Sequence, residues 1–572
     1  MNKRIRVVNK KKTDRIYLEA NNVAELLAAY EVHGERIFYA WKENGEVKEI
    51  SYADFAALVT NIAKGFRELY GEGGKKIAVI GETSPYWIAA HLATLASGNV
   101  VVPMDKELDP AEISKFFEYA DVSAVVHAKA FNPVFKEMIL DQKHPTVNCL
   151  IPINQEELES TANGNVLSLD TLAKMGSASE AEFFADTDVE RCCELLFTSG
   201  TTGTSKCVML CQKNIFSNVM SACETVDFEA DDVLVSVLPL HHTYELMCTI
   251  AGSCYGMKFC ACTSLRHVMK DFKEYRPTGL TLVPLFVTTM YKRILSEAKN
   301  SGKDKILGVA TKVAHTLKFA GIDLSEKVFK DVRSAFGGRL KKIICGGAAL
   351  SPELTSVFES FGISIYEGYG ITECSPLVAV TPYFKRKPGS VGPAVPCNEV
   401  RIDGLETNEL GFISGEIQVK GDNVMMGYMG NEEANAAAFT EDGWFRTGDV
   451  GYMDKDGYIY LTGRAKSVIV LDNGKNVFPE EIEEYLEKID EIAESVVVGR
   501  EEENGVKLVA IVLPAYEKYK DVDECELRGT IQKAITALNK RLPSFKQIHK
   551  IEFRKTEFEK TSSRKIKRHL VK

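Results

Sequence analysis

LLFTSGTTGTSKCVML, residues 195–210, places apolar segments on both sides of a run of small residues that ends in Lys206. Glycines at positions 200 and 203 let the backbone turn where a Cβ would clash, so that consecutive N–H groups can converge on an anion. The threonine and serine hydroxyls add donors, and Lys206 adds a mobile positive charge. The stretch therefore predicts a phosphate-binding loop between two strands, with a Ser/Thr/Gly-rich surface turn as the alternative.

A Walker-type loop is a poor match to this stretch. That motif places glycine immediately before its lysine and Ser or Thr immediately after it. Here Ser205 precedes Lys206 and Cys207 follows it. The sequence thus indicates a phosphate loop of another kind, which the rest of the chain must identify.

The composition narrows the class of protein. A chain of 572 residues is too long for one core, so at least two structural units are expected. The net charge of −10 argues against nucleic acid as a partner, because such a surface needs a basic footprint. The fourteen cysteines show no paired CxxC spacing for zinc, which favours reduced core residues and a cytoplasmic location.

Membrane insertion is not expected from the sequence. The basic N-terminal stretch lacks the apolar core of a signal peptide, and no run of 18 apolar residues occurs. Peripheral contact with a membrane stays open at this stage.

The region before the phosphate loop has the pattern of an α/β fold. A short apolar strand at Ile77–Ile80 precedes a turn at Gly81–Pro85 and a helix with one apolar face. A second apolar strand follows at Val100–Val102. This is a βαβ unit, which predicts a parallel sheet with helices on its faces. Residues 151–185 are polar and irregular in pattern, which indicates a connecting segment.

The character of the chain changes twice towards its end. A glycine-dense, β-rich region is expected from about residue 389 to 461. A small α+β module follows, in which Pro479 takes the first helical position ahead of two glutamates. We therefore expect a large domain at residues 1–464, with α/β layers and a β-rich subdomain, and a small mobile α+β domain at residues 465–572.

Five further stretches follow the loop in a fixed order. They are LPLHHTYE (238–245), ICGGAAL (344–350), YEGYGITE (366–373), WFRTGD (444–449) with LTGR (461–464), and KTSSRKIKR (560–568). The ordered set resembles the adenylate-forming, acyl-activating superfamily over essentially the whole chain. The resemblance implies that a carboxylate attacks the α-phosphate of ATP to give an acyl-adenylate and pyrophosphate. A thiol, usually coenzyme A, then displaces AMP.

The resemblance also assigns nucleotide-binding residues. The loop would cradle the β- and γ-phosphates, the GGA turn would pass the adenine, Tyr369 would stack on the base and Asp449 would accept the ribose hydroxyls beside Arg464. The implied nucleotide contacts are Thr198, Ser199, Gly200, Thr201, Thr202, Gly203, Lys206, Gly346, Gly347, Ala348, Tyr369, Gly370, Asp449 and Arg464. Glu373 and Thr198 are the expected contacts of Mg²⁺, a hard cation that prefers oxygen ligands.

Four residues carry the implied chemistry: Lys565, Thr372, Glu373 and His242. Thr372 would contact the α-phosphate, and the ammonium of Lys565 would stabilise charge during adenylation. His242 matches the family's histidine that gates the acyl pocket. Lys466 matches the hinge about which the C-terminal domain swings between the half-reactions.

Two features favour a long-chain fatty acid as substrate. The two-helix stretch at residues 296–342 resembles the insertion of long-chain fatty acyl-CoA ligases. The candidate acyl pocket, formed by Val283, Phe286 and Val287, is apolar and uncharged. The predicted activity is a fatty acid–CoA ligase that uses ATP, coenzyme A and Mg²⁺.

Two alternatives stay open. The acyl group could instead pass to the phosphopantetheine of a carrier protein, or the chain could be a degenerate nucleotide-binding paralogue. Three residues depart from the family pattern: Ser205 replaces a common proline, Cys207 a glycine after the loop lysine, and Arg564 a glycine before Lys565. None of the three removes a charged or metal-binding group, so activity is expected.

Overall fold

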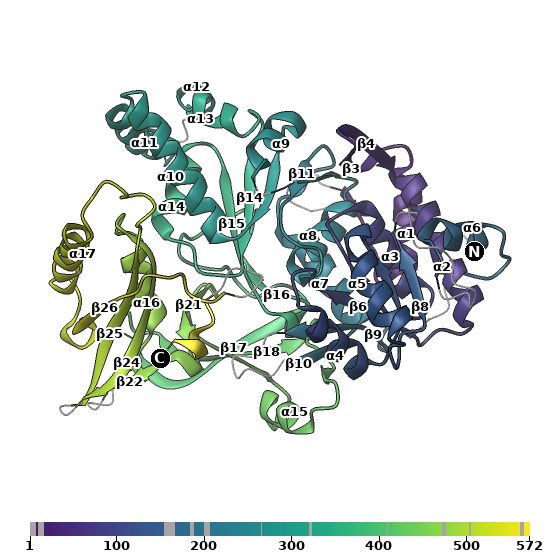
Figure 1. Cartoon of the computed structure of the whole chain (residues 1–572). Coiled ribbons are helices and arrows are strands. Elements are labelled where there is room, and N and C mark those ends of the chain that lie inside the picture. The colour runs from purple at the N-terminus through teal and green to yellow at the C-terminus, as the bar shows by residue number, and fades with distance from the viewer. Residues whose placement is uncertain are drawn as a thin grey trace. The chain divides into compact units, whose positions relative to one another are not determined.

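The structure is a computed structural model that describes residues 7–9, 16–153, 166–183, 188–198, 206–262, 264, 266–319, 323–408, 410–471, 476–502, 505–560 and 566–571. Its described residues fall into two compact units (Figure 1). Unit 1 takes residues from Met1–Thr198, Lys206–Glu399 and Val419–Ala437, and unit 2 takes residues from Val400–Gln418 and Ala438–Lys572.

The first large sheet of unit 1 has the strand order β19-β10-β9-β6-β5-β7-β8 within the described residues. Its strands are β5 (Lys76–Ile80), β6 (Val100–Met104), β7 (Val122–His127), β8 (Cys149–Pro152), β9 (Cys192–Thr198), β10 (Lys206–Cys211) and β19 (Gly427–Tyr428). The helices between these strands are α3 (Pro85–Ala96), α4 (Pro110–Ala120), α5 (Asn132–Phe135) and α6 (Leu169–Ser177). β5 pairs in parallel with both β6 and β7, so the expected βαβ unit is confirmed.

The βαβ unit forms because its helix is capped and apolar. The Ser84 side chain accepts from the Trp87 N–H, and Pro85 supplies the fixed φ of a first helical position. The helix α3 is buried around most of its circumference. Gly98, with φ of 76°, then reverses the chain into β6.

The second large sheet of unit 1 has the order β16-β15-β14-β13-β11-β12-β3-β4 within the described residues. Its strands are β3 (Ile37–Glu43), β4 (Glu46–Ser51), β11 (Val233–Ser236), β12 (Lys258–Ala261), β13 (Gly279–Leu282), β14 (Lys342–Gly346), β15 (Ser364–Gly370) and β16 (Leu377–Val380). The helices α1 (Val23–His33), α2 (Tyr52–Tyr70), α7 (Gln212–Thr225), α8 (Thr243–Ser253), α9 (Val268–Tyr275), α10 (Pro284–Asn300), α11 (Asp304–Phe319), α12 (Ser325–Val328), α13 (Lys330–Ala335) and α14 (Pro352–Ser360) complete unit 1, with a short β1 (Val7–Asn9) and β2 (Ile16–Leu18) ribbon.

The middle of this second sheet is parallel, from β3 through β12, β11, β13 and β14 to β15. One apolar cluster joins its strands to the helices that follow them, and it includes Val235, Leu282, Val287 and Phe358. Because both faces are covered, the strands are apolar runs without alternation.

Two details of unit 1 differ from the sequence-based expectation. The segment 151–185, interpreted as irregular connection, includes the last residues of β8 and the helix α6. The Ser168 hydroxyl caps α6, while Leu169 and Leu172 bury its apolar side. The second expected helix of the 296–342 stretch is divided into α12 and α13 at Phe329, whose ring is buried in the core.

Unit 2 contains the later strands and the C-terminal module. Its elements are β17 (Asn398–Thr407), β18 (Ile413–Gly421), α15 (Glu432–Ala438), β20 (Phe445–Met453), β21 (Ile459–Arg464), β22 (Ile469–Val470), β23 (Asn476–Val477), α16 (Pro479–Glu487), β24 (Ile492–Glu502), β25 (Gly505–Pro514), α17 (Glu524–Asn539) and β26 (Lys550–Phe553), of which β17, β18 and α15 cross into unit 1. Strands β17-β18-β20-β21 form one sheet and β24-β25-β26 another. The helices α16 and α17 bury Ile482, Leu486, Ile531 and Ile535 in a core that they share with the β24-β25-β26 sheet. The expected β-rich region and α+β module are therefore both present, and the α/β fold class is confirmed.

Candidate functional site

Three of the quoted motifs and the Val283 segment lie at one edge of the second sheet of unit 1. Strands β11, β13, β14 and β15 run in the same direction, and their carboxyl ends therefore meet at the same edge (Figure 1). LPLHHTYE follows β11, the Val283 segment follows β13, the GGA turn ends β14, and YEGYGITE ends β15. Ligands of open α/β sheets commonly bind at this edge.

The glycines of this edge are required by close packing. A Cβ on Gly346 would lie 3.1 Å from the Gly368 carbonyl oxygen on the neighbouring strand and 3.5 Å from the Tyr244 ring. Gly347 has φ of +88°, and a Cβ there would lie 3.6 Å from Cγ1 of Val283. Gly346 is buried, whereas Gly347 and Ala348 are exposed, so the backbone of the turn is uncovered at these two residues. A flat ligand could lie directly against such a backbone.

Tyr369 and Gly370 end β15, and Thr372 begins the short 3₁₀ helix Thr372–Cys374. A Cβ on Gly370 would lie 2.3 Å from the Pro376 carbonyl oxygen, so no other residue fits there. Tyr369 is 95% buried. The turn after β15 therefore holds Thr372 and Glu373 in a fixed backbone position.

The two ends of the phosphate loop are hydrogen-bonded strand neighbours. Thr198 is the last residue of β9 and Lys206 the first of β10, and the two face each other in an antiparallel pair. The Thr198 hydroxyl donates to the Lys206 carbonyl at 3.4 Å. Ser199, Gly200, Thr201, Thr202 and Gly203 lie outside the described residues.

An additional tyrosine connects the loop lysine to Glu373. The Lys206 ammonium lies over the Tyr428 ring, 4.3 Å from its centroid. The Tyr428 hydroxyl donates to Glu373 Oε1 at 2.9 Å. Tyr428 stands on β19, which pairs with β10, and the Met425 N–H donates to the Glu373 carbonyl at 2.8 Å. Lys206, Tyr428 and Glu373 thus form one connected group within unit 1.

No sequence motif marks Tyr428 as a site residue. Its only signal is the Gly427-Tyr428 pair in a glycine-dense region, and its partners are 55 and 222 positions away in the chain. The phenol is mostly buried, and burial raises its pKa above the usual range, with Glu373 adding to the shift. Tyr428 therefore acts at neutral pH as a neutral hydrogen-bond donor that orients the Glu373 carboxylate.

Cys207 lies in the core beneath the loop. Its side chain is 99% buried in the apolar cluster of the first sheet, and its carbonyl accepts from the Met429 N–H at 2.8 Å. Burial raises the pKa of the Cys207 thiol to about 12, so it is protonated at neutral pH. Since side chains alternate along a strand, Lys206 and Cys207 point to opposite faces of β10.

His241 and His242 lie ring to ring after β11, with centroids 4.3 Å apart. His242 precedes α8 as its N-cap residue. Burial and the neighbouring His242 lower the pKa of His241 to about 3, although Asp105 lies 3.6 Å from its Nε2. His241 is therefore neutral at physiological pH, and a charged imidazole is not available at that position.

The acyl-pocket candidates start at the same edge of the sheet. Val283 precedes α10 as its N-cap residue, Phe286 is half-buried against the core, and Val287 is fully buried within it. Val283 is the one of the three whose side chain lies near the Gly347 turn. Val287 contributes to the core that supports this helix.

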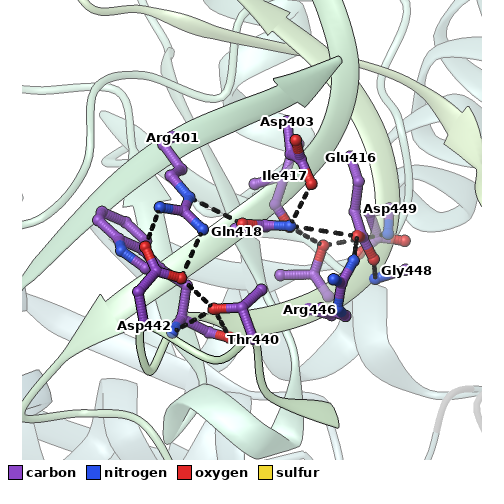
Figure 2. Close-up of polar contacts among 12 residues, drawn as sticks. Arg401, Asp403, Glu416, Ile417, Gln418, Thr440, Asp442, Arg446, Gly448 and Asp449 are labelled. Carbon is purple, nitrogen blue, oxygen red and sulfur yellow. Dashed lines mark hydrogen bonds and ion pairs between the residues drawn. The ribbon is translucent and has the colours of Figure 1, made fainter. Parts of the chain in front are cut away.

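In unit 2, Asp449 and Arg464 are opposite one another on β20 and β21. Arg464 Nε lies 3.0 Å from Asp449 Oδ1, and the Asp449 side chain is 92% buried. The Arg446–Asp449 segment of β20 is attached to β18. Glu416 Oε1 accepts from the Gly448 N–H at 3.2 Å, and its Oε2 accepts from Arg446 at 3.1 Å (Figure 2).

Thr447 adds two hydrogen bonds to the same segment of β20. Its hydroxyl donates to the Ile417 carbonyl at 2.7 Å and accepts from the Asp449 N–H at 3.0 Å. No sequence motif marks Glu416, because its bond to Gly448 connects residues 32 positions apart. The Asp449 carboxylate is therefore aimed by contacts that neither RTGD nor LTGR reveals by itself.

The two predicted lysines of the C-terminal region differ in how far the structure describes them. Lys466 is exposed in the short 3₁₀ helix Ala465–Ser467, directly after β21. Lys565 lies outside the described residues. The residues on either side of it are anchored: Lys560 pairs with Ile566 as a β-bridge and with Glu494 as an ion pair, and Arg568 pairs with Glu483.

Comparison with known proteins identifies the family. The family model described as AMP-binding enzyme matches residues 26–429, and the AMP-binding enzyme C-terminal domain matches residues 466–572. The chain therefore belongs to the AMP-binding enzyme family, whose members are adenylate-forming, acyl-activating enzymes. The resemblance found in the sequence is thereby confirmed.

Individual relatives are distant. Long-chain-fatty-acid–CoA ligase FadD15 of Mycobacterium bovis is 28% identical, with 97% of this chain and 95% of that protein covered. Long-chain-fatty-acid–[acyl-carrier-protein] ligase AEE15, chloroplastic, of Arabidopsis thaliana is 26% identical, with coverages of 88% and 78%. The crystal structure of ATP-bound MatB from Rhodopseudomonas palustris matches with a TM-score of 0.73 at 24% identity, covering 96% of this chain and 98% of that one. The structural match supports the shared fold.

Proposed function

We propose that this protein is a long-chain fatty acid–CoA ligase that forms an acyl-adenylate from ATP and releases AMP and pyrophosphate. The observation that supports the acyl specificity is the position of Val283, whose side chain lies beside the uncovered Gly347 turn. An apolar, uncharged residue at that place suits an alkyl chain next to a nucleotide. The FadD15 relative is named as a long-chain ligase, which agrees with the proposal.

In this proposal each site residue has one task. The backbone of Gly346, Gly347 and Ala348 faces the adenine, and Tyr369 stacks on it. Asp449, with Arg464 beside it, accepts the ribose hydroxyls. Lys206 and the loop hydroxyls hold the β- and γ-phosphates, and Thr372 contacts the α-phosphate. Adenylation of this kind depends mainly on positioning and on neutralising charge.

The residues present also fit a magnesium ion. Magnesium in nucleotide sites is commonly held by one or two carboxylates together with substrate phosphates. Glu373 is a half-buried carboxylate, oriented by the Tyr428 hydroxyl, and Thr198 supplies a hydroxyl at the start of the loop. Bound Mg²⁺ would supply charge neutralisation for the pyrophosphate leaving group. The Tyr428 hydroxyl keeps the Glu373 carboxylate in position.

We propose that Lys565 stabilises the adenylation transition state, that Lys466 is the hinge residue, and that residues 465–572 alternate between two positions. His242, neighbour of the neutral His241, gates the acyl pocket. Fourteen free cysteines suit a reducing compartment, and we place the protein in the cytoplasm on that basis.

A carrier protein is the second candidate for the thiol acceptor, because the Arabidopsis relative is named as an acyl-carrier-protein ligase. Purified protein should be assayed for pyrophosphate release with acids of two to eighteen carbons and ATP. Each acid is then tested with coenzyme A or with a phosphopantetheine-loaded carrier protein. A maximum at fourteen to eighteen carbons that requires coenzyme A supports the proposal. Pyrophosphate release independent of any acid would indicate a degenerate paralogue.

The two half-reactions separate the roles of the lysines. Lys565→Ala should abolish adenylate formation but spare thioester formation from supplied acyl-AMP. Lys466→Pro should give the opposite bias. Equal losses in both half-reactions for each variant would contradict the alternation of the C-terminal domain.

A further inference from the structure

The helix α11 presents apolar side chains outward. The sequence places Ile306, Val309, Ala310, Val313 and Leu317 at helical spacing, a pattern typical of a buried face. In the structure Ile306 is 67% exposed, Val309 63% and Val313 51%. Three β-branched apolar residues on successive turns therefore form a continuous exposed stripe.

The inward face of α11 is already satisfied by other residues. Leu307 and Ala310 pack against the core of the second sheet, and Ala314 is buried in it. The helix packs against α10 and α14 on that side. The stripe is consequently not needed to hold α11 on unit 1, and its exposure is not explained by folding.

Basic residues border the stripe. Lys305 and Lys312 are exposed, and their seven-residue spacing places them almost in line along α11, next to Val309 and Val313. Residues 292–318 contain seven lysines and arginines against two acidic residues, whereas the whole chain has 70 basic and 80 acidic residues. A local excess of positive charge thus accompanies the apolar stripe in a chain that is acidic overall.

This pairing of features fits one partner best. Exposed apolar side chains flanked by lysines are typical of a helix that lies in the interface of an anionic bilayer. The apolar groups enter the acyl boundary while the ammonium groups stay at the headgroups. A protein partner would need a matching acidic and apolar surface, and a second copy would set two basic stripes against each other.

We propose that the exposed face of α11, defined by Ile306, Val309, Val313, Lys305 and Lys312, docks on an anionic lipid surface. Docking is reversible and peripheral, since no helix within the described residues combines the length and apolar composition needed to span a bilayer. The proposal goes beyond the ligase activity and does not depend on it, because it concerns binding in the absence of ATP and acid.

The test is co-sedimentation of the full chain with vesicles of phosphatidylcholine alone or with 30 mol% phosphatidylglycerol, at 50 and 500 mM salt. Binding is expected on the anionic vesicles at low salt and should weaken at high salt. Lys305→Gln with Lys312→Gln should raise the lipid concentration for half-binding about 30-fold. Ile306→Gln, Val309→Gln and Val313→Gln together should raise it at least tenfold.

Matched controls come from other exposed positions of unit 1. Val32→Gln, Val47→Gln and Leu69→Gln together remove as many exposed apolar residues, and Lys115→Gln with Lys136→Gln removes as many charges. Both controls should bind as the unchanged protein does. Circular dichroism and thermal unfolding verify that every variant is folded.

Three outcomes would overturn the proposal. The first is the absence of vesicle binding by the unchanged protein, and the second is equal weakening by the α11 variants and their controls. The third is a loss of self-association in the triple α11 variant, measured by light scattering, with vesicle binding unaltered. That result would assign the stripe to a second copy of the chain.

Discussion

Replacing Glu416 by glutamine should raise the KM for ATP about tenfold and leave kcat within a factor of three. Glu416 does not itself contact the nucleotide in our proposal. It holds the Gly448 N–H and the Arg446 guanidinium, one on each carboxylate oxygen (Figure 2). We therefore expect Glu416 to act as a positioning residue for Asp449, the proposed ribose ligand.

The magnitude follows from the hydrogen bonds. A bond from a backbone N–H to a charged acceptor contributes about 1.5–3 kcal/mol. The Arg446 pair contributes about 1 kcal/mol or less, because the Arg446 side chain is 43% exposed. Glu416 Oε2 also accepts from Gln418 Nε2 at 3.4 Å. Glutamine keeps one acceptor oxygen but turns an NH₂ group towards one side of this set of donors. A net loss of about 1.4 kcal/mol corresponds to the expected tenfold change.

The loss should appear in binding rather than in chemistry. The Thr447 hydroxyl still connects the Ile417 carbonyl to the Asp449 N–H, so this segment of β20 keeps a side-chain bond to β18. The Asp449 carboxylate then samples more orientations before the nucleotide binds. Once ATP is bound, the reacting phosphate and carboxylate are unaffected.

The matched control is Asp442→Asn at the far end of the same network. Asp442 accepts a hydrogen bond from Arg401 Nη2 at 3.0 Å, and the Arg401 guanidinium holds the pKa of Asp442 well below the usual range of a carboxyl group. Its side chain is 57% exposed, so the substitution should change neither KM nor kcat appreciably. The assay is initial-rate pyrophosphate release over a range of ATP concentrations. Equal KM changes in the two variants, or a change of less than twofold in Glu416→Gln, would refute the reasoning.

Three further predictions concern unit 1. Lys342→Met removes the buried ammonium that lies 2.7 Å from Asp232 Oδ2, and it should lower the free energy of unfolding in urea by about 3–5 kcal/mol. Adding Asp232→Leu should restore stability, because no unpaired buried charge is then left. A loss under about 1 kcal/mol in the single variant would contradict this prediction. Burial raises the pKa of Glu367 from 4.5 to about 7. Between these two pH values the folded protein keeps a proton on Glu367, whereas the unfolded chain has released it. Stability therefore falls as the pH rises from about 4.5 to 7. Glu367→Gln should therefore flatten the stability–pH curve by up to about 1.4 kcal/mol per pH unit in that range, and an unchanged slope would count against the buried, protonated carboxyl. Tyr428→Phe keeps the ring under Lys206 but removes the hydrogen bond to Glu373. It should raise the Mg²⁺ concentration for half-maximal activity about fivefold. An unaltered Mg²⁺ dependence would show that Tyr428 does not act on the metal site.

Much of the fold could be predicted because its strands and turns carry local signals. The helix α3 begins at a Ser-Pro pair and stops at Gly98, and each feature acts within four residues of its own position. Parallel strands buried on both faces are apolar runs bounded by glycine or proline, which a reader of the sequence can locate. The helix α6 was missed because its apolar residues are few and its surroundings polar.

Periodicity identified α11 but not the direction of its face. The helix has apolar residues on about half of its circumference, so several stripes satisfy the same spacing rule. Which stripe turns inward depends on the neighbouring α10 and α14, and Ala310 and Ala314 allow the closer approach. The apolar periodicity of α11 therefore does not show which of its stripes packs inward, because that depends on helices formed by other parts of the chain.

The candidate site was predictable only where a motif is continuous in sequence. Thr198, Lys206 and Glu373 each stand in a recognisable string, but the connection between them passes through Tyr428, which arrives on β19 from a distant glycine-rich segment. Strand pairing brings it there: the Met429 N–H bonds to the Cys207 carbonyl, and this register places the Tyr428 ring under the Lys206 ammonium. The same alternation that turns Lys206 outward turns Cys207 into the core. Cys207, which departs from the family pattern, thus packs in the core below the loop. The Lys206 ammonium above it lies over the ring of Tyr428, a residue outside the loop motif.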